Sequence, residues 1–189
     1  MAATEPIRSK KHLKKLADYF LARQEYRNHA LVILGTYTAL RISDLLQIKW
    51  ADVYDEERQA YHTHLTVCEK KTKKTKVIAL NKEALHALRL CRPYKRNSFV
   101  FASNRDDKPI SREQAWRIVK RAVNDIGIEG KIACHSFRKS WGYHAWTSGK
   151  VSPVVIMDVL NHSSYDMTRR YLGITQDDLD KAYLGMWLF

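Results

Sequence analysis

The sequence predicts an α+β fold that is mostly α-helical and carries one small antiparallel β-sheet. Apolar residues recur at helical spacing along most of the chain. Residues 61–68 and 77–80 instead hold the β-branched, aromatic and apolar residues that strands favour, and the mostly basic segment 69–76 separates them as a hairpin tip. The sequence has no internal repeat, low-complexity tract or clear linker, so we expect residues 1–189 to form a single domain.

Capping residues and apolar periodicity define the expected helices. These helices cover residues 10–23, 26–38, 44–50, 81–90, 111–126, 135–147, 152–160 and 166–172, and a last one runs from residue 176 to near the end. Ser43 is expected to cap the third helix and Asn81 the fourth. Ser111 and Gln114 match a capping box for the fifth. Glycines are expected to end the fifth and sixth.

Composition and charge restrict the partners of the chain. Lys plus Arg is 33 and Asp plus Glu is 20, which gives a formal charge of +13 and points to a polyanion, nucleic acid first and an acidic membrane surface second. No apolar run approaches the ~20 residues needed to cross a bilayer, and residues 1–15 lack the apolar core of a secretory signal. The three cysteines form no CxxC pair or zinc pattern, so we expect reduced, buried thiols in a cytoplasmic protein.

Two arginines and a histidine have the chemistry to hold a phosphodiester. His135 and Arg138 are three residues apart and share one face of a helix, where a guanidinium can grip a phosphate beside an imidazole. An isolated pair of this kind is common, so a capping histidine and a solvated arginine are the alternatives. Arg41 follows an apolar stretch, and it either pairs with Asp44 or Asp52 or grips the same phosphate.

A lysine, a second histidine and a tyrosine complete the candidate set. Lys71 lies where the first strand ends, and it either donates a proton to a leaving 5′-oxygen or only holds DNA phosphates like its neighbours. His162 and Tyr171 are nine residues apart, and their alternatives are a helix cap and a packed aromatic. A phenol with a pKa of ~10 is a poor nucleophile unless a base or nearby cations activate it. No carboxylate pair suits a two-metal nuclease and no glycine-rich phosphate loop is present, so we expect neither a metal nor a nucleotide cofactor.

Taken in order, these motifs resemble the catalytic domain of the tyrosine recombinases, the phage-integrase family. The matching segments are residues 39–45, 69–80, 135–138 and 160–164, followed by Tyr171, and the resemblance covers about residues 6–185. Asn161 and Lys139 depart from it, because glycine and histidine are usual at those positions. About 35 residues precede the segment of Arg41, so we expect a compact member without the separate N-terminal core-binding domain.

The resemblance implies a mechanism. Tyr171 would attack the scissile phosphate to give a 3′-phosphotyrosyl link and a free 5′-hydroxyl. Arg41 and Arg138 would grip the non-bridging oxygens and Lys71 would protonate the leaving oxygen. His135 would act in proton transfer and His162 would hydrogen-bond the phosphate.

The resemblance also implies partners and leaves two rival functions open. Double-stranded DNA would be bound by a homotetramer at nucleoid sites in the cytoplasm, with accessory DNA-bending or directionality proteins as further partners and no membrane. The first rival is a type IB topoisomerase-like enzyme that relaxes supercoils by the same chemistry. The second is a DNA-binding regulator that keeps the fold without the activity.

The C-terminal segment carries an apolar stripe at helical spacing. The stripe consists of Leu179, Ala182, Tyr183, Met186 and Trp187. It either packs on the core of its own chain or, as the resemblance implies, docks into a neighbouring protomer.

Overall fold

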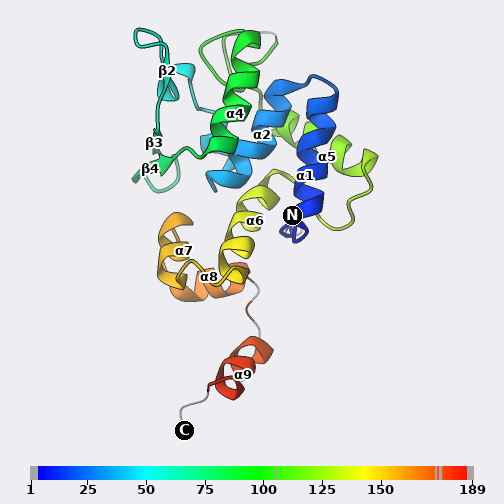
Figure 1. The fold of residues 1–189 in the computed structure, drawn as a ribbon, viewed down its shortest axis with the longest axis vertical. Helices are drawn as coiled ribbons and strands as arrows, with labels where there is room; N and C mark the ends of the chain where they lie inside the picture. Colours follow the sequence, from blue (N-terminus) through cyan, green and yellow to red (C-terminus); the bar gives the residue numbers. More distant parts are fainter. Residues whose placement is uncertain (1–3, 105, 173, 175, 187–189) are drawn as a thin grey trace. The chain divides into compact units, whose positions relative to one another are not determined.

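The computed structural model describes residues 4–104, 106–172, 174 and 176–186, apart from the side chains of Arg170, Asp178 and Ala182 (Figure 1). It confirms a mostly helical α+β fold. The helices are α1 (Lys10–Ala22), α2 (Tyr26–Tyr37), α3 (Ile42–Leu45), α4 (Lys82–Cys91), α5 (Arg112–Asp125), α6 (Cys134–Thr147), α7 (Pro153–Val159), α8 (Tyr165–Leu172) and α9 (Gln176–Leu184), with 3-10 turns η1 (Trp50–Asp52) and η2 (Arg92–Tyr94). The strands are β1 (Tyr54–Asp55), β2 (Ala60–Tyr61), β3 (His64–Cys68) and β4 (Thr75–Ala79).

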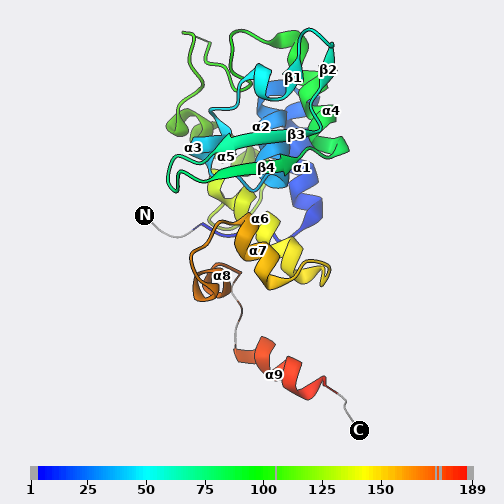
Figure 2. The same cartoon turned by 90° about the vertical axis from the view of Figure 1, so that its left-hand side faces the viewer.

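The chain forms two compact units, Met1–Trp141 and Gly142–Phe189, and the boundary falls inside α6. In the first unit, α2 packs against α1 and α4, and α1 packs against α5. The strands form two antiparallel pairs, β1 with β2 and β3 with β4, instead of the one sheet that we expected. Figure 2 shows β3 and β4 running side by side, with His64 opposite Ala79 and Cys68 opposite Thr75.

The core of the first unit fixes the start of α6. Leu31 and Leu34 of α2 are fully buried, together with Phe137 of α6. A Cβ atom at Gly35 would lie 2.9 Å from Phe137 Cδ2, so the glycine lets the two helices approach closely. Because Arg138 follows Phe137 directly, this packing also fixes where Arg138 leaves the helix.

Side-chain caps confirm several of the expected helix starts. The side chains of Asn81 and Ser111 accept hydrogen bonds from the N–H groups of Ala84 and Gln114, respectively. The expected cap at Ser43 is wrong, because α3 starts at Ile42 and ends within one turn.

The expected helix over residues 44–50 is also wrong beyond that first turn. The reason is that residues 48–50 pair with another segment of the chain. Trp50 N–H donates to Ser98 C=O, and Val100 N–H donates to Ile48 C=O, both at 2.9 Å. These bonds use backbone groups that a helix would need.

The second unit is built around a small apolar centre. α7 packs on α8, and Ile156, Leu160 and Leu172 are buried. A Cβ atom at Gly142 would lie 3.2 Å from Leu172 and 3.3 Å from Leu160, so a glycine at this point of α6 allows close packing.

The C-terminal apolar stripe is buried only in part, because Leu179 of α9 is half-buried but the described residues after it are exposed. Tyr183 is 81% exposed and Met186 is 66% exposed. Trp187 lies outside the described residues. Within the second unit, Tyr183 and Met186 therefore present apolar surface to solvent.

The cysteines follow the expectation only in part. Cys91 is buried and Cys134 is half-buried, and burial raises the pKa of their thiols to about 11 and about 12. Cys68 is exposed, which corrects the expectation, because it lies on the outer face of β3. Within the described residues, no helix combines the length and apolar character that crossing a membrane requires.

Candidate active site

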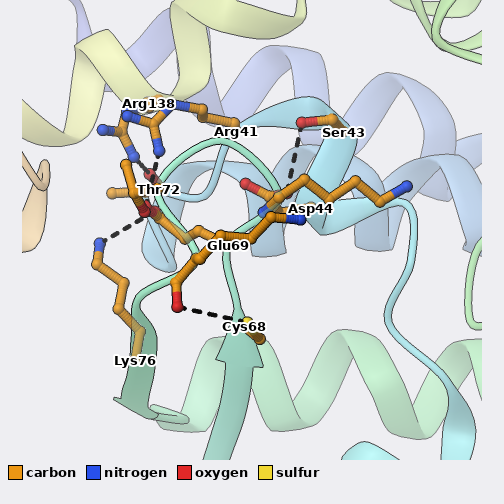
Figure 3. Close-up of polar contacts among 11 residues, drawn as sticks. Arg41, Ser43, Asp44, Cys68, Glu69, Thr72, Lys76 and Arg138 are labelled. Atoms are coloured by element: carbon orange, nitrogen blue, oxygen red, sulfur yellow. Dashed lines mark hydrogen bonds and ion pairs between the residues drawn. The ribbon is translucent and has the colours of Figure 1, made fainter.

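Arg41 is held by a buried carboxylate that the sequence motifs did not identify. Its Nη1 donates to Glu69 Oε2 at 2.8 Å, and Glu69 is fully buried. The same Oε2 accepts a hydrogen bond from Thr72 Oγ1 at 2.9 Å, and Lys76 Nζ lies 3.6 Å from Oε1. Figure 3 shows these three side chains converging on Glu69. We refer to Arg41, Glu69, Thr72, Lys76 and Arg138 as the arginine cluster.

The alternative in which Arg41 pairs with Asp44 or Asp52 is wrong. Asp52 instead accepts a hydrogen bond from the backbone N–H of Lys49 at 2.8 Å. Asp44 is buried, and its Oδ1 accepts from the backbone N–H of Lys70 at 3.1 Å. Asp44 therefore ties α3 to the hairpin turn rather than neutralising Arg41.

Arg138 is anchored by a backbone carbonyl. Its side chain is only 2% exposed, and Nη1 donates to Ala39 C=O at 2.5 Å. Ala39 has a φ of 52°, in the left-handed region that a residue with a Cβ adopts only at a cost. Figure 3 shows Arg138 beside Arg41, so one short turn before α3 contributes to the placement of both arginines.

His135 titrates well below its ordinary range. Burial is the main cause, and the positive charges of Arg138, Lys139 and Arg41 add to it, so the pKa falls to about 4. The imidazole is therefore neutral at neutral pH and can accept or donate a proton.

Two lysines of the β3–β4 hairpin have different environments. Lys71 is exposed in the turn. Lys76 lies on β4, and its side chain is only 14% exposed. Burial lowers the pKa of Lys76, Glu69 opposes that shift, and Arg138 and Arg41 reinforce it. We did not predict Lys76, although the alternation along β4 puts it on the same inward face as Ile78.

In the second unit, His162 and Tyr171 are in contact. Their ring centroids are 4.9 Å apart in an edge-on arrangement. His162 Nδ1 lies 3.0 Å from Thr168 Oγ1, and Thr168 is fully buried. Asn161, just before His162, has a φ of 46°, which explains why this position suits a glycine or an asparagine.

The structure thus gathers the predicted site residues into two groups. Arg41, Arg138 and His135 influence one another in the first unit, and His162 contacts Tyr171 in the second. The exposed Lys71 is linked to the first group through its neighbours in the turn. Among the described side chains, no three His, Cys, Asp or Glu residues are grouped to hold a metal ion.

The fold is that of the catalytic domains of tyrosine recombinases. The structure superposes on XerA recombinase with a TM-score of 0.74 and 20% identity, over 97% of this chain and 66% of that one. A lambda integrase dimer bound to a COC′ core site matches with a TM-score of 0.70 and 20% identity, over 100% of this chain and 51% of that one.

The sequence matches the model of the phage integrase family over residues 9–177, so the chain belongs to the phage integrase family. A probable integrase/recombinase, YoeC of Bacillus subtilis, is 36% identical over 184 residues, which are 97% of each chain. Tyrosine recombinase XerD of Corynebacterium glutamicum is 29% identical over 167 residues, 85% of this chain and 53% of that protein. The chain therefore spans nearly all of the first relative but about half of the second. By its family it is a tyrosine-type recombinase.

Proposed function

We propose that the protein is a site-specific DNA recombinase that cuts and rejoins DNA through a 3′-phosphotyrosyl intermediate. The observation that carries the proposal is the arginine cluster beside a neutral His135. Two guanidinium groups suit the two non-bridging oxygens of one phosphodiester, whose charge grows in the transition state. We further propose that residues 1–189 act as one catalytic domain.

Each candidate residue has a chemical role in this proposal. Tyr171 Oη attacks the phosphorus, and the bond to the 5′-oxygen breaks. Lys71 donates a proton to that oxygen, and His135, being neutral, takes part in proton transfer. Arg41 and Arg138 hold the phosphate, as does a hydrogen bond from His162. In the second step a 5′-hydroxyl attacks the phosphotyrosine, which restores the DNA backbone and frees Tyr171.

The proposed partner is double-stranded DNA. The formal charge of +13 and the exposed lysines of the hairpin turn support it, because cations that neutralise phosphates release counterions and give salt-sensitive binding. Solved relatives support it as well, since XerH was crystallised on a palindromic difH substrate. We propose a homotetramer on DNA, in which Tyr183 of α9 and Met186, which follows that helix, pack against a neighbouring copy.

A nicked suicide duplex tests the proposal directly. The duplex is built from the ends of the mobile element that neighbours the gene, and cleavage traps the enzyme on it. We expect a denaturant-stable protein–DNA adduct with the wild type and none with Tyr171→Phe. Relaxation of supercoiled plasmid without strand exchange would favour the topoisomerase-like rival. Tight, salt-sensitive binding without an adduct would favour the regulator.

A further inference from the structure

Glu69 is buried at the centre of the arginine cluster, and the chemistry proposed above gives it no role. A fully buried carboxylate is costly unless charged and polar partners surround it. Here Arg41 and Thr72 both donate to Oε2, and Lys76 approaches Oε1. The carboxylate therefore balances the positive charge that Arg41, Arg138 and Lys76 bring together.

The position of Glu69 links two parts of the proposed catalytic apparatus. Arg41 precedes α3, whereas Thr72 is the neighbour of Lys71 in the hairpin turn, and both bonds end on the same oxygen atom. From the other side, Asp44 of α3 accepts the N–H of Lys70. A shift of the turn would therefore disturb the guanidinium, and a shift of the guanidinium would disturb the turn.

We propose that Glu69 is a positioning residue for DNA strand cleavage, which orients the Arg41 guanidinium and couples it to the turn that carries Lys71. The inference rests on the function proposed above. Glu69 accepts a hydrogen bond from Nη1 of Arg41, and a guanidinium carries further N–H groups that can donate to a phosphate. Donors that are fixed before the phosphate arrives need no reorganisation in the transition state.

The test is Glu69→Gln, which keeps the shape of the side chain and one acceptor oxygen but removes the charge. On the suicide duplex at saturating protein, we expect the cleavage rate to fall about 10- to 100-fold, as for small misplacements of catalytic groups. We expect the dissociation constant for the duplex to stay within about threefold of wild type or to tighten, because a negative charge is lost. A wild-type cleavage rate in Glu69→Gln would overturn the proposal.

Glu56→Gln is the matched control. Glu56 also pairs with an arginine and a lysine, at 2.6 Å to Arg92 and 3.0 Å to Lys95, but it is 53% exposed and lies outside the arginine cluster. The same change of carboxylate to amide there should leave the cleavage rate at the wild-type value. An equal loss in both variants would mean that Glu69 has no special role.

A double-mutant cycle separates positioning from a purely structural role. If Glu69 acts through Arg41, then Glu69→Gln should add little to the loss already caused by Arg41→Lys. Independent effects would multiply, and that result would contradict the proposal. If Glu69→Gln fails to fold, Thr72→Val removes the bond from Oγ1 to the carboxylate and leaves the carboxylate in place. We expect it to slow cleavage about 3- to 10-fold, and an unchanged rate would overturn the proposal. A wild type that makes no adduct would instead refute the proposed function itself.

Discussion

The arginine cluster and the His162–Tyr171 pair differ in how far along the chain their contacts reach. Arg41 bonds to a residue 28 positions away, and Arg138 bonds to one 99 positions away. His162 instead contacts Thr168, six positions away, and the ring of Tyr171, nine positions away. The hydrogen bonds of the proposed phosphate-binding groups therefore depend on the tertiary fold of the first unit, whereas the proposed nucleophile shares a ring contact with a nearby turn. Packing within the second unit adds to that contact, because a Cβ atom at Gly142 of α6 would lie 3.7 Å from Tyr171 Cε1.

The strongest test of this difference compares Arg138→Ala with Tyr171→Phe. Both variants should abolish adduct formation, but only Arg138→Ala should also lower the free energy of unfolding. We expect a loss of about 2–3 kcal/mol, because the substitution leaves a cavity and a buried carbonyl without its donor. Tyr171→Phe removes one hydroxyl from a half-buried side chain, so we expect a change below about 0.5 kcal/mol. Urea unfolding at pH 7 measures both, and equal losses would show that the two regions are not built differently.

Arg138→Lys is the milder companion variant. It keeps the positive charge but loses the planar fork that a phosphate and the Ala39 carbonyl use. We expect cleavage to fall at least about 100-fold with most of the stability retained. A lysine variant that cleaves at the wild-type rate would mean that charge alone suffices at this position.

The pH dependence of the free energy of unfolding tests the surroundings of His135 in the first unit. The pKa of His135 is lowered from 6.5 to about 4 by burial and nearby cations, so the unfolded chain binds the proton more tightly than the folded one. The resulting stabilisation is complete above pH 6.5 and is lost as the pH falls from 6.5 toward 4. The total over this range is about 3 kcal/mol, of which about 2 kcal/mol falls between pH 7 and pH 5.

The variant His135→Asn should remove that part of the pH dependence. Urea unfolding at pH 7 and pH 5 measures the difference, with His86→Asn on the exposed face of α4 as the control. The control should lose stability between the two pH values as the wild type does. If His135→Asn loses as much stability between pH 7 and pH 5 as the wild type does, His135 is not the source of this pH dependence.

The same difference in contact range explains what could be predicted from the sequence. Helix caps such as Asn81 and Ser111, the β3–β4 hairpin, and the spacing of His135 from Arg138 are local features that a sequence shows directly. The partner of Arg41 is not local. The sequence offered Asp44 and Asp52 nearby, but the fold brings in Glu69 from the hairpin.

Two further features escaped prediction for the same reason. The Ala39 carbonyl that holds Arg138 depends on a left-handed residue that no glycine marks. The short α3 ends early because residues 48–50 pair with residues 98–100, about fifty positions away. Tertiary hydrogen bonds overrode the local helical pattern in that segment.

Substitution by glycine should cost less stability at Ala39 than at an ordinary buried alanine. Replacing buried Ala30 of α2 by glycine should cost about 1–2 kcal/mol, because a methyl contact and helix propensity are both lost. At Ala39, relief of the left-handed strain should offset the lost methyl, so we expect a change within about 0.5 kcal/mol. Thermal unfolding of the two variants measures the difference. Equal losses would show that Ala39 carries no strain.

The smallest expected effect concerns Asn161, the left-handed residue of the second region. Asn161 N–H bonds to Asp158 C=O and His162 N–H bonds to Met157 C=O, which closes the end of α7. Asparagine tolerates this conformation better than alanine does, so Asn161→Gly should change stability by less than about 0.5 kcal/mol, whereas Asn161→Ala should cost about 1 kcal/mol. Because His162 follows directly, the alanine variant should also slow cleavage of the suicide duplex, and the glycine variant should not. If both variants cleave at the wild-type rate, the turn at Asn161 stabilises the end of α7 but does not position His162. The contacts near the turn would then matter for folding and not for cleavage.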